Sequence, residues 1–442
     1  MTVQGPTVQG PTVQDARCCR GSGPRARIVL VTRPGHERIY QEDAHARRRG
    51  PIPGPRHRVR PHSILADAVA AGQRAGLDDL INFSIGDPDI TTDQRITRAA
   101  MDDALAGHTH YTAPHGDPEL VAAIVEAQRA DYGVDVEPGQ VLVTASACHA
   151  MALACMAVLD PDLPPARRRE VIVPEPYFNC YDGQIEQAGG VPVHVPTSEA
   201  DGFQLRPEAL EAAITPRTRA IILNTPTNPS GVCWSREAQL VIARVAAEHD
   251  LLVLADDIYT AFSYAEPFIP FATLPGMAER TVTVRSFSKN YAMTGWRIGY
   301  AMGPAPIIGA MTDINENIVY TAPAPSQRAA LAAIRLRHEI MPPIAELYRS
   351  RLMAAYREIC DTPRMHALEP GGAIYLWVNI ADTGLSSAEV MDAMLHQAHV
   401  LTIPGPAFGA SGEGYLRLAA TLDVKRIHEA FARIRRMAIF GG

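Results

Sequence analysis

The sequence predicts an α/β fold: a large domain with a mostly parallel central sheet flanked by helices, plus a smaller α+β domain. Three observations predict it. From about residue 95 to 330, short β-branched runs alternate with longer helical patterns, which is typical of a parallel sheet covered by helices. After residue 335, the pattern becomes helix, strand, helix, strand and helix. At 442 residues, the chain also exceeds what a single hydrophobic core usually supports.

The large domain is expected over residues 95–334. Helices are expected between its strands, for example at 150–159 and 237–249. Ligands of such sheets bind beyond the carboxyl ends of the strands, so the residues that follow each run are the place to look for a site. The strand candidates are VLVT (141–144), VIV (171–173), AIILN (220–224), LLVLA (251–255) and TVTVR (281–285).

The small domain is expected to combine residues 61–94 with residues 335–442, so that two segments far apart in the chain build one domain. Its later segment alternates amphipathic helical patterns with short apolar runs. The expected helices are at 344–359, 387–399 and 425–437, and the expected strands are at 373–380 and 415–420.

Residues 1–60 differ from the rest. They repeat TVQGP and carry twelve Arg against four acidic residues, a balance of +8. With many Gly and Pro and no sustained hydrophobic period, they are predicted to form a disordered basic extension. They lack the apolar core of a secretory signal.

Composition excludes several classes of protein. The net charge of −7 gives no broad cationic surface, so nucleic acid is not an expected partner. The absence of a run of eighteen apolar residues argues against a membrane-spanning helix. Seven cysteines without a C-x-x-C pair fit neither a disulfide framework nor a zinc site, so no metal is expected and a cytoplasmic location is predicted.

Lysine is rare in this chain. Of the 41 basic Lys and Arg residues, only Lys289 and Lys425 are lysines. Chemistry that needs an amine, such as a Schiff base, can use only these two side chains or the N-terminus. Lys425 stands beside Arg426 in an amphipathic pattern typical of a solvated helix face, which leaves Lys289 as the candidate.

Polar groups of one chemistry follow the strand candidates. A carboxylate, a phenol, an amide, a lysine and a serine–arginine set are expected to meet at one edge of the sheet. These groups suit a pyridine ring that carries a phosphate and an aldehyde. They are Asp256, Tyr259, Asn228, Ser286, Ser288, Lys289 and Arg297.

The segments around these residues resemble, in order and spacing, those of pyridoxal-phosphate enzymes of fold type I. The resemblance is to the class I/II aminotransferase family, which includes aspartate and aromatic amino-acid aminotransferases. It extends from about Ile81 to about Ile434 and leaves out residues 1–60. The segments are SFSKNYAMTGWRIGY (the lysine signature), NTPTNPSG (the asparagine loop), ADDIY, and PGPAFG followed by YLRL.

The resemblance implies three catalytic residues. Lys289 is the Schiff-base lysine and then moves a proton as general base and acid. Asp256 keeps the pyridine nitrogen protonated, while its neighbour Asp257 is interpreted as structural. Tyr259 and Asn228 hydrogen-bond the ring oxygen O3′.

The same resemblance assigns the phosphate and the ring faces. Phosphate contacts are expected from Ser286, Ser288 and Arg297, and from backbone N–H groups where a helix opens after strand 141–144. Phe178 is expected to stack on the ring, with core packing as the alternative. The helix-opening residues are Ser146, where many relatives have Gly, Ala147 and Cys148.

Three further residues concern the substrate and the assembly. Arg417 resembles the arginine that grips the substrate α-carboxylate, with a buried structural role as the alternative. Gly86 and Asn228 are expected beside that carboxylate. Tyr111 resembles a tyrosine that reaches the phosphate of the neighbouring subunit, which implies a homodimer.

The expected function is therefore a pyridoxal-phosphate-dependent aminotransferase that moves an amino group from an L-amino acid to a 2-oxo acid by a ping-pong mechanism. A C–S lyase, or a related eliminating or cyclising enzyme of the same fold, would use the same lysine, aspartate and arginine. A non-catalytic sensing protein would need a DNA-binding domain, and residues 1–60 show no pair of amphipathic helices. No Lys or Arg in the motifs is free for a distal carboxylate, which favours neutral or aromatic donors.

Overall fold

The computed structural model describes residues 28–33, 36–41 and 64–441. Contacts between Cα atoms divide the chain into two units, Met1–Pro61 and His62–Gly442. In the first unit, β1 (Ile28–Arg33) pairs with β2 (His36–Gln41) in antiparallel register. The prediction of a disordered extension over residues 1–60 did not include this strand pair, although the β-branched run IVLVT favours a strand. The remainder of that prediction lies outside the described residues.

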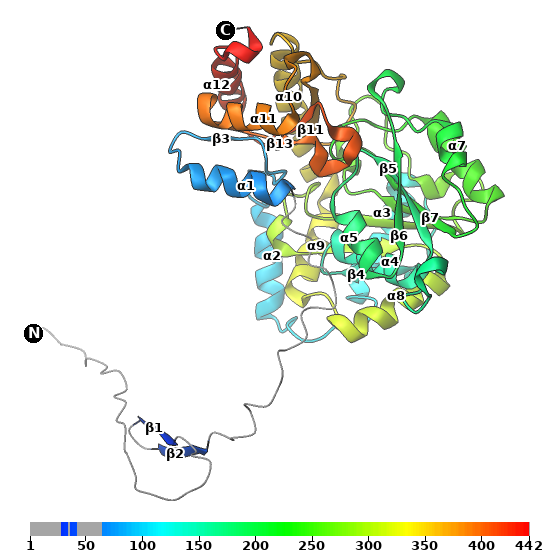
Figure 1. The fold of residues 1–442 in the computed structure, drawn as a ribbon. Helices are drawn as coiled ribbons and strands as arrows, with labels where there is room; N and C mark the ends of the chain where they lie inside the picture. The colour runs from blue at the N-terminus through cyan, green and yellow to red at the C-terminus, as the bar shows by residue number, and fades with distance from the viewer. Residues whose placement is uncertain (1–27, 34–35, 42–63, 442) are drawn as a thin grey trace, which may run out of the picture. The chain divides into compact units, whose positions relative to one another are not determined.

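The second unit is built on a seven-stranded sheet of order β4-β10-β9-β8-β7-β5-β6 (Figure 1). Strand β10 runs antiparallel to both of its neighbours, and the other pairs are parallel. Four of the five predicted runs lie within one of these strands, and the fifth, 251–255, begins one residue before β8. Their bounds are β4 (Val141–Thr144), β5 (Glu170–Glu175), β6 (Val191–Pro196), β7 (Thr218–Asn224), β8 (Leu252–Asp256), β9 (Thr281–Ser286) and β10 (Gly299–Met302).

Helices cover both faces of this sheet. The fully buried strands β4 and β8 are largely apolar, as expected for a sheet buried on both sides, and β9 is buried as well although Thr and Val alternate in it. Figure 1 shows the green and yellow helices around the strands. They are α3 (Pro118–Tyr132), α4 (Ala147–Val158), α5 (Cys180–Gln187), α6 (Pro207–Ala212), α7 (Arg236–Glu248), α8 (Ala305–Ile318) and α9 (Ala324–Arg335), with α2 (Gln94–Leu105) packed on α9.

Strand β8 shows how the alternation of side chains positions a functional group. Leu252 and Leu254 pack in a cluster with residues of α4, α5 and α8, whereas Val253 and Ala255 pack in a cluster with residues of α7. Because side chains alternate across a strand, Asp256 falls on the same face as Leu252 and Leu254. The Asp256 carboxylate therefore lies on the face of the sheet that α4 and α5 cover.

Two smaller sheets lie in the same unit. One has the order β11-β14-β13 and is antiparallel, and the other pairs β12 with β3 in parallel. Figure 1 shows α1 and β3, from early in the chain, beside β13 and α11 from its last hundred residues. The elements are α1 (Ile64–Ala75), β3 (Ile81–Asn82), α10 (Arg337–Cys360), β11 (Tyr375–Asn379), α11 (Ser387–Ala393), β12 (Val400–Leu401), β13 (Ile403–Pro404), β14 (Tyr415–Ala419) and α12 (Val424–Ile434).

A glycine brings the antiparallel strand close to the helix that begins at the site. A Cβ atom on Gly299, the first residue of β10, would lie 2.7 Å from the backbone nitrogen of Ala147 and 2.8 Å from the carbonyl oxygen of Arg285. Any side chain there would push α4 away from the sheet.

Among the described helices, none is both long enough and apolar enough to span a bilayer.

Candidate active site

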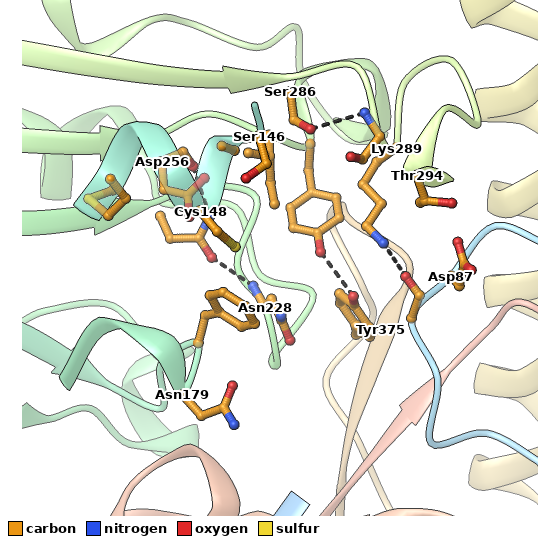
Figure 2. Close-up of a pocket in the computed structure, with 18 of the residues that line it drawn as sticks. Asp87, Ser146, Cys148, Asn179, Asn228, Asp256, Ser286, Lys289, Thr294 and Tyr375 are labelled. Atoms are coloured by element: carbon orange, nitrogen blue, oxygen red, sulfur yellow. Dashed lines mark hydrogen bonds between the residues drawn. The ribbon is translucent and has the colours of Figure 1, made fainter. Parts of the chain in front are cut away.

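One cavity of about 430 Å³ lies beyond the carboxyl ends of β4, β7, β8 and β9 and is bounded on its other side by residues of β11 and β14. Figure 2 shows its side chains converging from these elements. Every predicted site residue except Tyr111 lines it. They are Gly86, Ser146, Ala147, Cys148, Phe178, Asn228, Asp256, Tyr259, Ser286, Ser288, Lys289, Arg297 and Arg417.

Lys289 stands in the loop that follows β9 and is half-buried. Its amine crosses the cavity and donates a hydrogen bond to the carbonyl oxygen of Gly86 (Figure 2). The loop is held by the backbone N–H of Ser288, which donates to Ser286 Oγ at 3.0 Å. The structure therefore presents one lysine amine inside the cavity, whereas Lys425 lies exposed on α12.

Asp256 is the last residue of β8, and 5% of its surface is exposed. Its Oδ2 accepts a hydrogen bond from the Tyr181 hydroxyl at 2.5 Å, and its backbone carbonyl accepts one from Asn224 Nδ2 at 2.8 Å. Its Oδ1 is buried and has no hydrogen-bond partner among the described residues. Burial raises the pKa of Asp256 to about 6, and the Tyr181 hydroxyl opposes that rise.

Tyr259 is buried three residues after Asp256. Its hydroxyl lies 2.9 Å from that of Tyr375, the first residue of β11. Burial, followed by the neighbouring Tyr375, raises the pKa of Tyr259 well above its usual range, so its hydroxyl keeps its proton. Asn228 is fixed from its own loop, because its backbone N–H donates to Asn224 Oδ1 at 2.8 Å.

The start of α4 forms one end of the cavity. Ser146 is its N-cap residue, and Ser146 Oγ accepts from the backbone N–H of His149 at 3.1 Å. The first turn of a helix presents N–H groups that suit an anion, and Ala147 and Cys148 lie in that turn. Arg297 adds a guanidinium to the lining of the same cavity. Its backbone φ is 52°.

Arg417 enters from β14, and 5% of its surface is exposed. Its Nη2 donates to the carbonyl oxygen of Ser84 at 2.5 Å, and its Nη1 donates to Asn228 Oδ1 at 3.3 Å. The guanidinium lies over the rings of Tyr375 and Phe408, at 4.8 and 4.7 Å from their centroids. Its Nε has no hydrogen-bond partner among the described residues. A buried cation with an unpaired donor suits a carboxylate ligand.

Tyr111 is not part of the cavity of its own chain. Its side chain is 82% exposed and makes an edge-to-face contact with Tyr320, with ring centroids 5.1 Å apart. The structure therefore leaves this predicted phosphate ligand on the surface.

Sequence reasoning missed several residues of the cavity. Tyr181 and Tyr375 contact Asp256 and Tyr259 directly, yet neither falls in one of the recognised segments. Their position close to Phe178 and at the start of a predicted strand was the available signal. The other missed lining residues that bond to predicted ones are Ser84, Gln184, Asn224 and Thr294. Gln184 Nε2 donates to the carbonyl oxygen of Cys148 at 3.0 Å, and the carbonyl oxygen of Thr294 accepts from Arg297 Nη1 at 2.9 Å.

These groups fit the pyridine cofactor that the sequence implies. The free Oδ1 of Asp256 offers an acceptor for a protonated ring nitrogen, and the first turn of α4 with Arg297 offers an anion site for its phosphate. The amine of Lys289 lies in the same cavity. The residues present are therefore sufficient to hold the ring, the phosphate and the aldehyde.

Comparison with known proteins decides the family. Residues 78–434 match the model of the family described as aminotransferase class I and II. The chain belongs to this family. It is thus a pyridoxal-phosphate-dependent aminotransferase, and its fold is that of the fold type I aminotransferases.

Individual aminotransferases resemble this one over nearly their whole length. The aspartate aminotransferase of Geobacillus stearothermophilus is 36% identical over 381 residues, which cover 83% of this chain and 95% of that protein. The arginine–pyruvate transaminase of Pseudomonas aeruginosa is 35% identical over 357 residues, covering 81% and 89%. The crystal structure of an aromatic aminotransferase from Pyrococcus horikoshii OT3 superimposes with a TM-score of 0.78 at 34% identity, covering 84% of this chain and 98% of that one.

Proposed function

We propose that this aminotransferase moves the amino group of a neutral or aromatic L-amino acid to a 2-oxo acid by a ping-pong mechanism in one cavity. The observation that carries this proposal is the convergence of an amine (Lys289), a carboxylate with one free oxygen (Asp256) and a buried guanidinium (Arg417) on that cavity. When bound, pyridoxal phosphate supplies the aldehyde and the electron-withdrawing ring for this chemistry.

Each of these residues has a separate proposed role. Arg417 binds the substrate α-carboxylate, which places the Cα–H bond near the Lys289 amine. Lys289 would hold the cofactor aldehyde, and its free amine would serve as general base and acid at the substrate Cα. Asp256 stabilises the proton on the ring nitrogen, because an anion in a buried site favours a nearby cation. Tyr259 and Asn228 offer hydrogen-bond donors to the ring oxygen O3′.

Seven residues are proposed to enclose the ring and the phosphate. They are Phe178, Ser146, Ala147, Cys148, Ser286, Ser288 and Arg297. Phe178 lines the cavity at the end of β5, where its ring can stack on the cofactor. The two serines and Arg297 add hydroxyl and guanidinium donors to the N–H groups of α4.

The charges of the cavity support neutral or aromatic donors. Among the lining residues of the described chain, the Lys and Arg side chains are Lys289, Arg297 and Arg417, and each already has a proposed task. Apolar side chains of Val69 and Ile85 line the same cavity. A dicarboxylic donor would need a further cation for its distal carboxylate.

A homodimer is proposed from the surface around Tyr111. Tyr111 and Tyr320 contact each other and are both exposed, and Leu105 is 88% exposed at the end of α2. Exposed apolar side chains of this size indicate an interface. A second copy of the chain would cover them and bring each Tyr111 to the phosphate of its partner.

Two further proposals concern the domain organisation of the chain and its location in the cell. Residues 61–94 and 335–442 are proposed to form a small domain beside the large domain of residues 95–334. A shared apolar cluster supports it, because Ile81 and Phe83 pack with residues of α10, α11 and α12. A cytoplasmic location is proposed from the free cysteines.

The test is a single-substrate experiment on the holoenzyme. Phenylalanine, leucine and aspartate are added separately without an oxo acid, and the absorbance of the bound cofactor is followed. Transamination converts the cofactor to its amino form and releases one equivalent of oxo acid per site. We expect the second-order rate constant of this half-reaction to be about tenfold or more higher for phenylalanine than for aspartate, which corresponds to one lost ion pair. S-methylcysteine, which has a thiolate leaving group at Cβ, is added in parallel: continuous release of methanethiol, ammonia and pyruvate from it would identify an eliminating lyase instead.

A further inference from the structure

Tyr181 touches the catalytic carboxylate but has no role in the function proposed so far. It is the second residue of α5, and 2% of its surface is exposed. Its hydroxyl donates to Asp256 Oδ2 at 2.5 Å, and its side chain also lines the cavity. This bond joins two elements that are 75 residues apart in the sequence.

The bond decides which oxygen of Asp256 remains available. A carboxylate can rotate about its last torsion, so its two oxygens are interchangeable unless one is held. Tyr181 holds Oδ2, while Asn224 Nδ2 holds the backbone carbonyl of the same residue at 2.8 Å. Oδ1 is buried, has no hydrogen-bond partner in the described part of the chain, and is left as the acceptor for a ring nitrogen.

The bond also favours the charged form of Asp256. Burial raises the pKa of this carboxyl, and hydrogen bonds from the Tyr181 hydroxyl and the Ile258 backbone lower it. Lys289 and Arg297 line the same cavity as Asp256. Other titratable groups of the described residues also interact with this carboxylate. They are Cys180 on α5, Cys148 on α4, and Asp257 and Tyr259 in its own segment.

We propose that Tyr181 is a positioning residue of the transamination: it keeps Asp256 ionised and turned so that Oδ1 meets the nitrogen of the cofactor ring. This inference rests on the proposed role of Asp256. Tyr181 acts through that carboxylate and not on the substrate, because its one hydroxyl proton is already donated to Oδ2.

The chain contains a matched control. Tyr177, four residues earlier, also donates its hydroxyl to a buried carboxylate, Asp182 Oδ2, at 2.7 Å. Tyr177 does not line the active-site cavity. Tyr181→Phe and Tyr177→Phe each remove one buried phenol–carboxylate bond, so a merely structural effect should be similar in both variants.

The first measurement is the affinity of the full-length apoprotein for pyridoxal phosphate between pH 5 and pH 9. In Tyr181→Phe, we expect the affinity at neutral pH to fall about tenfold and its acid limb to move up by about one pH unit. The holoenzyme should lose kcat with little change in KM. Tyr181→His retains a ring donor and should fall between wild type and Tyr181→Phe. Tyr177→Phe should follow the wild-type curve.

The second measurement places Tyr181→Phe in an Asp256→Ala background. Because Tyr181 acts through Asp256, the double variant should bind the cofactor as Asp256→Ala does. A further loss in the double variant, or an acid limb that is the same in Tyr181→Phe and wild type, overturns the role of Tyr181. If Asp256→Ala itself leaves the affinity and its pH dependence unchanged, the proposed role of Asp256 is the part that fails.

Discussion

The hydroxyl oxygens of Tyr259 and Tyr375 lie 2.9 Å apart, and their rings meet edge to face with centroids separated by 5.8 Å. This contact joins the loop after β8 to the first residue of β11. Both tyrosines line the cavity. If Tyr375 donates to Tyr259, the Tyr259 proton is left for the ring oxygen of the cofactor, so Tyr375 sets the direction in which Tyr259 donates.

Tyr375→Phe should therefore weaken cofactor binding. Loss of one neutral hydrogen bond predicts a three- to tenfold rise in the Kd for pyridoxal phosphate, on the order of 1 kcal/mol. Fluorescence titration of the apoprotein measures it. Tyr264→Phe is the control, because the Tyr264 hydroxyl donates to the carbonyl oxygen of Ala373 outside the cavity. Equal Kd values for Tyr375→Phe and wild type would contradict this prediction.

Lys289→Ala should abolish covalent attachment of the cofactor and nearly all turnover. The amine of Lys289 is the one lysine amine in the cavity, so no other lysine can take its place. Borohydride reduction of the holoenzyme followed by peptide mass analysis should find the cofactor on Lys289. Lys425→Ala is the control and should behave as wild type. Cofactor found on Lys425 would show that Lys289 is not the residue that binds it.

The stability of the apoprotein should show a contribution from Asp257 that falls as pH rises. Burial raises the pKa of Asp257 to about 7 from an ordinary value of 3.8, and Arg285, 3.7 Å away, only partly offsets this. Between these pH values the unfolded chain ionises first, so the contribution is complete below about pH 4 and is lost as pH rises through about 7. Urea unfolding of wild type and Asp257→Asn at pH 5 and pH 8 measures it. The stability of wild type relative to Asp257→Asn should decrease by a few kcal/mol over this interval. A constant or increasing difference would show that Asp257 is ionised throughout.

Two inactive chains should restore one site when mixed, if Tyr111 acts across the interface. In a heterodimer of a Lys289→Ala chain and a Tyr111→Ala chain, the site on the second chain keeps Lys289 and borrows Tyr111 from the first. Its cofactor affinity should return toward the wild-type value for one site in each heterodimer. Each homodimer alone is the control. Affinity that stays at the Tyr111→Ala level in every mixture would mean that Tyr111 serves its own subunit or none.

Removal of residues 1–55 should leave turnover and cofactor affinity within about twofold of wild type. The match to the family model begins at residue 78, so this segment lies outside the sequence that the family shares. Few buried contacts would be lost. The measurements are kcat/KM, the Kd for pyridoxal phosphate and the sedimentation of the shortened chain. A truncated protein that cannot dimerise or bind cofactor would show that the segment is structural.

The strands that position the site could be predicted because their signal is local. LLVLA is apolar and TVTVR is rich in β-branched residues, and each is followed at once by a polar residue, Asp256 or Ser286. Strand β10 was missed because GYAM is short and has no β-branched residue. Its antiparallel direction depends on pairing with β4 and β9, which are distant in the chain.

The partners of the site residues could not be predicted in the same way. Tyr181 and Tyr375 are ordinary members of a helix and a strand, and nothing near them in sequence shows that they meet Asp256 and Tyr259. Their contacts arise from tertiary packing across 75 and 116 residues. Motif resemblance found the groups expected to touch the cofactor and missed Tyr181 and Tyr375, because these two lie outside the recognised segments.

The scarcity of lysine on this chain has a practical consequence for handling the protein. Reagents that acylate amines find Lys289 inside a cavity and Lys425 exposed near the start of α12, besides the α-amino group. With the cofactor on Lys289, a dye or a sensor surface would couple to the folded protein at Lys425 nearly alone among its side chains. Once the α-amino group is blocked, molecules attached through Lys425 would share one orientation and keep the catalytic amine unmodified, so the enzyme could be immobilised without engineering a tag.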